Sequence, residues 1–103
     1  TIEDMKKNKL IGPIVSHAGD GNFHVALLID KKSDEELKKL DDFLIRISER
    51  AIRMDGTCTG EHGVGQGKRK YMLKELGGAV DIMKKVKNAF DPNKIMNPGK
   101  LFL

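Results

Sequence analysis

Two short apolar runs with a polar, Gly-rich stretch between them stand out in the first third of the chain. The runs cover residues 11–16 and 25–29, and the stretch between them reads His17-Ala18-Gly19-Asp20-Gly21-Asn22-Phe23-His24. The dipeptide Asp20-Gly21 favours a two-residue turn, because both residues tolerate the positive φ that a type I′ turn requires. We therefore expect a β-hairpin with strands over about 11–18 and 23–30, in a register that sets His17 opposite His24.

A long amphipathic helix is predicted after the hairpin. Ser33 and Glu36 have the spacing of a capping box, and the acidic residues of the first turn suit the helix dipole. Apolar residues then recur at intervals of three and four, which predicts a helix over about 34–54. The stripe expected to pack against the sheet consists of Leu37, Leu40, Leu44, Ile47, Ala51 and Met54.

A loop and two shorter helices complete the predicted elements. Residues 55–67 contain five glycines, so their backbone can bend sharply or approach a ligand closely. We expect helices over 68–76 and 79–90, the second of which is stopped by Asp91-Pro92. The apolar face of that second helix is Ala79, Ile82, Met83, Val86, Ala89 and Phe90. The tail over 95–103 is apolar and rich in turn residues, and we expect it to dock.

These elements place the chain in the α+β class, with a β-hairpin, one long amphipathic helix and a C-terminal helical pair. The length of 103 residues suits one domain. A two-stranded sheet is marginal on its own, so we expect either further strands from a longer protein or a homodimer. The chain begins at Thr1 rather than at a Met, which also indicates a piece of something longer.

Composition and charge narrow the function classes. The 19 basic and 15 acidic residues give a net charge of +4, which suits an anionic partner such as a carboxylate or a phosphate. No basic arm or aromatic-interleaved strand is present, so we expect no nucleic-acid partner; salt-sensitive RNA or DNA binding would mark that alternative. The single Cys58 excludes an intrachain disulfide and is expected to be a small buried residue rather than a metal ligand. No apolar run approaches the ~18–20 residues of a membrane span, and no secretory signal is present.

The hairpin histidines are candidate metal ligands. Two imidazoles on one face of a hairpin can reach one ion, and Glu61 of the Gly-rich loop would add a carboxylate. Zinc, manganese and iron sites combine these donors, and three protein ligands leave a position for water or substrate. The alternative is a pair of half-exposed histidines beside a polar turn. Asp20 and Asn22 are either turn formers or groups that orient the imidazoles.

His62 directly follows Glu61 in the sequence. Neighbouring side chains point apart in an extended segment, so we expect His62 to act as a base rather than as a second ligand of the same ion. The alternative is a solvated loop histidine. The run over 63–69 is not a phosphate loop, because His62 and Arg69 stand where that motif needs Gly and Ser or Thr. A helix N-terminus at Lys68 would still favour an anion.

Three motifs carry a family resemblance: residues 16–24, residues 55–65, and Asp91-Pro92 followed by Asn97-Pro98-Gly99-Lys100. In this order they resemble the C-terminal region of FAD-linked D-2-hydroxy-acid dehydrogenases. These are the cytochrome-type D-lactate dehydrogenase and glycolate oxidase flavin-subunit relatives within the vanillyl-alcohol-oxidase superfamily. The resemblance covers nearly the whole chain from Gly12 onward. It implies that residues 1–103 are a fragment of a larger C-terminal, or cap, domain, without the N-terminal FAD-binding domain.

The resemblance also implies roles for individual residues. The family holds a divalent metal (zinc, manganese or iron in our expectation) through the residues that correspond here to His17, His24 and Glu61. The histidine after that glutamate is the general base, which is His62 here. The closing segment of the family lies near the flavin. The cofactor-binding residue expected on this ground is Asn97, and Gly60 and Gly63 of the Gly-rich loop are expected as further cofactor contacts.

The implied activity is oxidation of a small D-2-hydroxy acid to the 2-oxo acid, with metal-assisted deprotonation of the hydroxyl and hydride passed to FAD. Ala26 stands where D-2-hydroxyglutarate dehydrogenases carry Asn, which favours D-lactate or glycolate as the substrate. The expected electron acceptor is cytochrome c, a quinone or an electron-transfer flavoprotein, in a cytoplasmic or membrane-peripheral setting in a prokaryote. The fragment alone is expected to be inactive. The alternative from another class is a non-catalytic metal-binding or regulatory module built on the same hairpin.

Overall fold

The computed structural model describes residues 1–102 and contains two compact units, Thr1–Arg50 and the part from Ala51 onward. The first unit contains, in order, α1 (Ile2–Lys7), β1 (Ile14–His17), the 3-10 turn η1 (Ala18–Asp20), β2 (Asn22–Val25) and most of α2 (Asp34–Arg53). The second contains η2 (Arg69–Tyr71), α3 (Met72–Leu76) and α4 (Ala79–Phe90). This mixture of helices and one antiparallel sheet is the predicted α+β class. None of the helices formed by residues 1–102 has the length and hydrophobicity needed to cross a membrane.

The hairpin has a different register from the predicted one. β1 and β2 are antiparallel, and His17 lies opposite Asn22 rather than opposite His24. The connection is η1 followed by Gly21, which is left-handed at φ 67°, instead of a two-residue turn at Asp20-Gly21. This longer connection shifts the pairing by two residues. Because side chains alternate from face to face along a strand, a shift of two leaves both histidines on the same face of the hairpin.

Backbone pairing continues beyond the ends of the two strands. The Ala26 N–H donates to the Pro13 carbonyl at 3.1 Å, and the Leu28 N–H donates to the Ile11 carbonyl at 2.8 Å. The paired region therefore reaches the predicted start at residue 11. A Cβ added to Gly12 would lie 2.1 Å from the Ala26 carbonyl oxygen, so this close approach of the two backbones requires glycine.

The predicted long helix is present as α2, and its N-terminus is capped as a modified capping box. The Ser33 Oγ accepts a hydrogen bond from the Glu36 N–H at 3.3 Å. The Glu36 carboxylate accepts from the N–H of Asp30 at 2.5 Å, where the predicted box would use the N–H of Ser33. The carboxylate thus ties the helix to the turn that precedes it.

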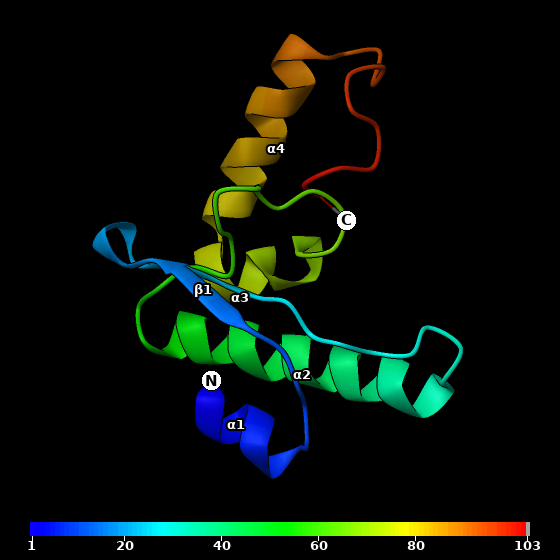
Figure 1. Cartoon of the computed structure of the whole chain (residues 1–103). Coiled ribbons are helices and arrows are strands. Elements are labelled where there is room, and N and C mark those ends of the chain that lie inside the picture. The colour runs from blue at the N-terminus through cyan, green and yellow to red at the C-terminus, as the bar shows by residue number, and fades with distance from the viewer. Residues whose placement is uncertain (103) are drawn as a thin grey trace. The chain divides into compact units, whose positions relative to one another are not determined.

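The predicted apolar stripe of α2 is buried only in part, because Leu40, Ile47 and Ala51 are half-buried. Phe43 and Ser48 are the buried positions, at 1% and 9% exposed, whereas Leu44 is 45% and Met54 74% exposed. The side of α2 that carries Phe43 also carries Arg46 and Arg50, one and two turns further along. Both arginines bind Asp4 of α1, so α1 covers this side of the helix (Figure 1).

The ion pair between α1 and α2 is mostly shielded from water on its acidic side. The Asp4 side chain is 8% exposed and lies 2.8 Å from the guanidinium of Arg46 and 3.1 Å from that of Arg50. The hydrogen bond from Arg46 is the main cause that lowers the pKa of Asp4 to about 2. Met5 is buried next to this pair in sequence, so α1 is anchored by one charged and one apolar side chain.

The helices of the second unit lie where the sequence predicted them. Gly77, at φ 52°, follows the end of α3, and α4 occupies the predicted range 79–90. The apolar face of α4 is largely exposed, with Ile82, Val86 and Phe90 at 64%, 53% and 82%. Val80 is buried instead, at 2% exposed. It lies on the side of α4 that also carries Lys84, Lys87 and Asp91, which the returning tail of the chain covers.

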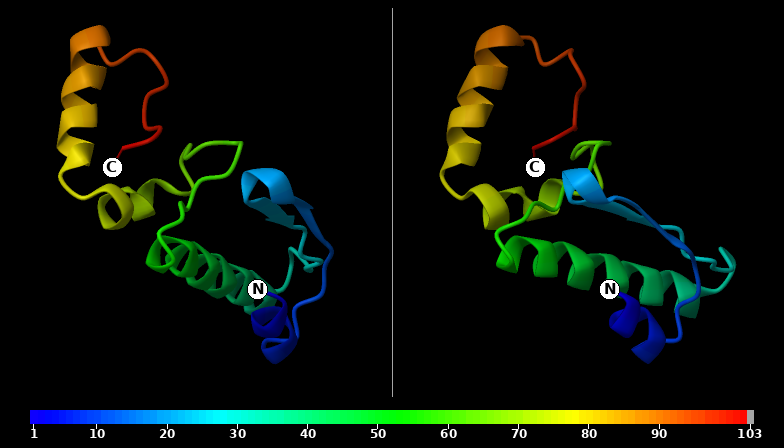
Figure 2. Two further views of the ribbon diagram at one scale, coloured as in Figure 1. Left: turned by 90° about the vertical axis from the view of Figure 1, so that its left-hand side faces the viewer. Right: turned by 60° about the vertical axis from the view of Figure 1, so that its left-hand side comes forward.

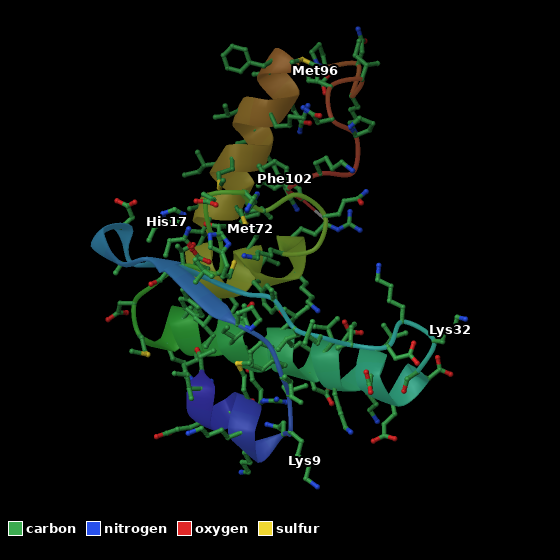
Figure 3. The ribbon with its side chains drawn as sticks, in the orientation of Figure 1. Lys9, His17, Lys32, Met72, Met96 and Phe102 are labelled. Carbon is green, nitrogen blue, oxygen red and sulfur yellow. The ribbon has the colours of Figure 1, made fainter. Side chains whose placement is uncertain are left out.

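The tail turns back along α4, as predicted for a docked segment (Figure 2). Met96 lies at the far end of α4 and Phe102 lies back towards its start (Figure 3). Two hydrogen bonds fasten the tail to the Gly-rich loop and to η2. The Leu101 N–H donates to the Gly65 carbonyl at 2.8 Å, and the Arg69 guanidinium donates to the Gly99 carbonyl at 2.8 Å.

Candidate functional site

The two hairpin histidines lie together on one face of the sheet. His17 ends β1 and His24 lies in β2, and their positions are diagonal across the ladder rather than opposed. Their ring centroids are 5.7 Å apart and the ring planes meet at 80°. His17 is exposed and His24 is half-buried. The predicted proximity is therefore present, although the register that was expected to produce it is not.

This arrangement fits the demands of a metal site. A ring nitrogen of His17 and one of His24 lie within 4.8 Å of each other. Two imidazoles bound to one tetrahedral ion would place their nitrogens about 3–4 Å apart, so small side-chain rotations suffice. Of the other residues of this motif, Asp20 lies in η1 and Asn22 pairs with His17, so both serve the turn. Their orienting role towards the imidazoles stays a prediction.

Glu61 and His62 lie on a tight turn of the second unit. The Gly63 N–H donates to the Gly60 carbonyl at 3.1 Å, and Gly63 is left-handed at φ 75°. The prediction that the two side chains point apart was wrong, because it assumed an extended segment. In the turn, the Nε2 of His62 lies 3.4 Å from a carboxylate oxygen of Glu61. Gly60 and Gly63 build this turn, and their contact with a cofactor stays a prediction.

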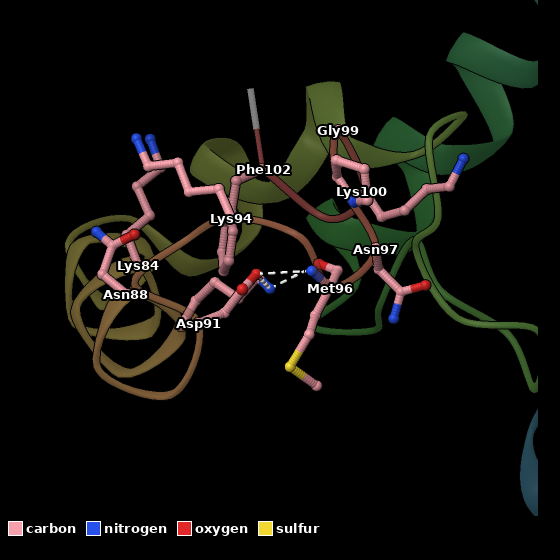
Figure 4. A pocket seen from close by; sticks show the side chains of 11 residues that line it. Lys84, Asn88, Asp91, Lys94, Met96, Asn97, Gly99, Lys100 and Phe102 are labelled. Atoms are coloured by element: carbon pink, nitrogen blue, oxygen red, sulfur yellow. Dashed lines mark hydrogen bonds and ion pairs between the residues drawn. The ribbon is translucent and has the colours of Figure 1, made fainter.

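Asn97 lies in the turn at the start of the closing segment. Its own φ is 46°, a conformation that Asn tolerates better than most residues, and its carbonyl accepts from the Lys100 N–H at 3.3 Å. A cavity of about 430 Å³ between α4 and the tail is lined in part by Asp91, Met96 and Asn97 (Figure 4). The Asn97 side chain is directed away from Asp91 in this view.

Sequence reasoning missed the polar side chains that hold this tail. Asp91, which the sequence offered as a helix stop and as part of a family motif, is 3% exposed and accepts from the N–H groups of Ile95 and Met96. Lys87 pairs with the Asp91 carboxylate. The spacing of four between Lys87 and Asp91 is a signal for an ion pair on a helix, and it could have identified them. Arg69, which binds the Gly99 carbonyl, carried no comparable local signal.

Cys58 is buried, as predicted, at 5% exposed. Its N–H donates to the Glu75 carboxylate at 2.9 Å. Burial, and then the neighbouring Glu75 carboxylate, raise the pKa of the Cys58 thiol to about 11. A protonated, buried thiol is a packing group rather than a nucleophile or a metal ligand.

Comparison with known families identifies the chain. The family model for the C-terminal domain of FAD linked oxidases matches residues 1–101. The chain belongs to this family. The match includes the hairpin, the Gly-rich loop and the closing segment, so all three sequence motifs lie within one family domain.

Curated relatives of this FAD-linked oxidase domain are similar over nearly all of it. It is 52% identical to D-lactate dehydrogenase [cytochrome] 1, mitochondrial, of Saccharomyces cerevisiae, over 99% of this chain and 17% of that protein. It is 45% identical to the probable mitochondrial D-lactate dehydrogenase of Danio rerio, over 98% of this chain and 20% of that protein. It is 46% identical to glycolate oxidase subunit GlcD of Bacillus subtilis, over 84% of this chain and 18% of that protein. The chain thus spans about a fifth of the length of these relatives.

Proposed function

We propose that this domain serves a flavin-dependent dehydrogenase that oxidises a small D-2-hydroxy acid, D-lactate or glycolate, to the 2-oxo acid. The observation that carries the proposal is the pair of imidazoles on one face of the hairpin, with ring nitrogens within 4.8 Å of each other. Membership of the FAD linked oxidase family and similarity to a D-lactate dehydrogenase and a glycolate oxidase subunit support the same reaction class.

The proposed metal ligands are His17, His24 and Glu61, with zinc, manganese or iron as the ion. The donor set of two imidazoles and one carboxylate suits any of these ions. When bound, such an ion would supply Lewis-acid chemistry towards the hydroxyl and carboxylate oxygens of a 2-hydroxy acid. The hairpin holds His17 and His24 on the same face. The two imidazoles are therefore close together before the ion binds, which lowers the entropic cost of binding it.

His62 is the proposed general base. Its side chain is 82% exposed on the Gly60–Gly63 turn, so a substrate hydroxyl can reach it. It would accept the hydroxyl proton at a ring nitrogen, and the adjacent Glu61 carboxylate limits the positions that the ring samples. The tight turn brings the proposed ligand and the proposed base next to each other.

Asn97 is the proposed contact to FAD, which, when bound, supplies the hydride acceptor. Its amide can both donate and accept a hydrogen bond, as a contact to a polar ring edge requires. The left-handed turn at Asn97 and the hydrogen bond from Lys100 to its carbonyl fix the local backbone. Gly60 and Gly63 are proposed as further cofactor contacts, because neither carries a side chain that would block a close approach.

The small side chain of Ala26 favours a small substrate. The Ala26 N–H continues the ladder register, so Ala26 lies on the same face of the hairpin as His24, two residues before it. A methyl group there leaves room beside the imidazoles but offers no hydrogen bond to a second carboxylate. We therefore propose D-lactate or glycolate over a dicarboxylic 2-hydroxy acid.

The electron acceptor, the assembly and the location of the protein are further predictions. The predicted electron acceptor is cytochrome c, a quinone or an electron-transfer flavoprotein, and the two-stranded sheet is predicted to be completed either by further strands of a longer protein or in a homodimer. A cytoplasmic or membrane-peripheral location likewise stays a prediction.

The test uses the full-length protein with its FAD bound. Anaerobic mixing with D-lactate or glycolate should bleach the flavin absorbance of the wild type, and His62→Ala should abolish this reduction while FAD stays bound. Gln66→Ala changes an exposed residue in the same loop, and its flavin should be reduced at the wild-type rate. Reduction at the wild-type rate in His62→Ala would remove His62 from the role of base. A wild type that binds metal but is reduced by neither acid would favour the non-catalytic module.

A further inference from the structure

A buried carboxylate holds the residues just before Asn97. Asp91 directly follows α4 and is 3% exposed. Its two carboxylate oxygens accept from the N–H of Ile95 at 3.0 Å and from the N–H of Met96 at 3.1 Å. The side chain therefore binds forward along the tail, whereas its own N–H closes the helix by donating to the Lys87 carbonyl at 2.9 Å.

Lys87 completes a clamp around Met96. Its ammonium group binds the Asp91 carboxylate and also donates to the Met96 carbonyl at 2.7 Å. The N–H and the carbonyl of Met96 are thus both held, one by each member of the ion pair. The hydrogen bond from Lys87 is the main cause that lowers the pKa of Asp91, so the carboxylate is ionised at neutral pH. Figure 4 shows the contact between Asp91 and the Met96 backbone.

The other side of Asn97 is held as well. The Gly99 carbonyl accepts from the Arg69 guanidinium at 2.8 Å, two residues after Asn97. Asn97 itself has a φ of 46°, a left-handed conformation that strains most L-residues and that Asn tolerates better than the others. The neighbours on both sides of this strained residue are therefore fixed by charged side chains.

We propose that Asp91, together with Lys87, is a positioning residue for Asn97. This inference rests on the proposed function, in which Asn97 contacts FAD. The charged clamp on Met96 fixes the direction in which the chain enters the left-handed turn, and so fixes where the Asn97 amide lies. A displacement of about 1 Å in such a group can slow a reaction by about 100-fold.

The test measures the limiting rate of flavin reduction by D-lactate, or by glycolate if that acid reduces the wild type faster. It uses full-length protein, and each rate is expressed per bound flavin. Asp91→Ala should lower this rate about 10- to 100-fold. Asp91→Asn keeps an oxygen acceptor but loses the charge, so its rate should lie between the rates of Asp91→Ala and the wild type. Asp81→Asn, which changes an exposed carboxylate on α4, is the matched control, and its flavin should be reduced at the wild-type rate.

A double mutant separates positioning from a structural role. If Asp91 acts through Asn97, then Asp91→Ala added to Asn97→Ala should lower the rate no further than Asn97→Ala alone. A loss of FAD or of folded protein with an unchanged rate per bound flavin in Asp91→Ala and Asp91→Asn would overturn the inference, because that is the outcome of a structural role. Additive losses in the double mutant would also overturn it. If wild-type flavin is reduced but Asn97→Ala has no effect, the placement of Asn97 fails; if the wild type is not reduced, the proposed function itself fails.

Discussion

Gly12 and Ala26 approach each other across the hairpin so closely that a Cβ on Gly12 would lie 2.1 Å from the Ala26 carbonyl oxygen. The strands cannot keep this distance with any other residue at position 12. We expect Gly12→Ala to reduce the free energy of unfolding by about 1–3 kcal/mol, as overpacking does. Urea titration of the variant and the wild type measures this difference in the free energy of unfolding. Gly19→Ala, where an added Cβ has no atom within 4 Å, should change stability far less. Equal stability of the two variants would contradict the close approach.

Loss of one hairpin imidazole should lower metal content and activity together. His17→Ala in the full-length protein removes one proposed ligand, and we expect metal affinity to fall at least about 10-fold. Elemental mass spectrometry on protein purified without an affinity tag gives the metal content per chain. His62→Ala is the matched control, because it should keep the metal while flavin reduction is lost. An inactive His17→Ala protein with full metal occupancy would rule out His17 as a ligand.

A larger polar side chain at position 26 should disfavour a small substrate. We expect Ala26→Asn to lower kcat/KM for D-lactate about 10-fold, because Asn adds volume and a polar group beside His24. Ala26→Ser changes the volume little and should keep most of the activity. Steady-state kinetics with D-lactate and glycolate provide the measurement. An Ala26→Asn enzyme as fast as the wild type would show that this face of the hairpin does not meet the substrate.

The ion pair of Asp4 predicts a pH dependence of stability. The pKa of Asp4 in the folded protein, about 2, lies below its ordinary value of 3.8. The carboxylate therefore stabilises the fold above about pH 4 and loses this effect as the pH falls towards 2. Asp4→Asn should cost about 1–2 kcal/mol at pH 7, allowing for the partial exposure of the arginines, and little at pH 2.

Urea unfolding at pH 7, 4 and 2 measures this difference. Asp41→Asn changes an exposed carboxylate on α2 and should show a much smaller pH-dependent effect. The prediction fails if Asp4→Asn and the wild type differ by the same amount at every pH.

The Cys58 thiol should react slowly with alkylating reagents. A pKa of about 11 instead of 9.0 makes the thiolate fraction at pH 8 about 100-fold smaller, and burial blocks access as well. Intact-mass measurement after iodoacetamide treatment should show little modification of the folded protein and full modification in urea. Glu75→Gln removes the neighbouring carboxylate and should speed the reaction. Rapid alkylation of the native protein would mean that Cys58 is exposed.

Local patterns were sufficient for the hairpin, for the helices after it and for the histidine face, whereas α1 was not predicted. The periodicity located α2 and α4, and the Gly and Asp residues of the motif located the hairpin connection. The register was missed because a type I′ turn and a 3-10 turn followed by a left-handed Gly21 both need glycine at the same place. The prediction that His17 and His24 share a face held despite this error, because side chains alternate between the two faces of a strand and a shift of two residues leaves each on its face.

Long-range contacts decided the features that sequence reasoning missed. Phe43 lies on the side of α2 where Arg46 and Arg50 bind Asp4, which comes 42 residues before Arg46 and 46 residues before Arg50. The pattern identified the apolar face of α4, but the tail covers the side with Val80 and Asp91 instead. The bond from Arg69 to Gly99 joins residues 30 positions apart. No window of local sequence contains both partners of such contacts.

The fastening of the tail to the Gly-rich loop has a consequence for how this region opens. The Leu101 N–H can exchange its hydrogen with solvent only after its bond to the Gly65 carbonyl breaks, and Gly65 lies two residues beyond the Gly63 that ends the His62 turn. The exchange rate of this one amide thus reports how often the His62 loop and the segment with Asn97 come apart. Cleavage or truncation of the chain after Gly99 would remove this bond and so loosen the loop at Gly65, far upstream in the sequence.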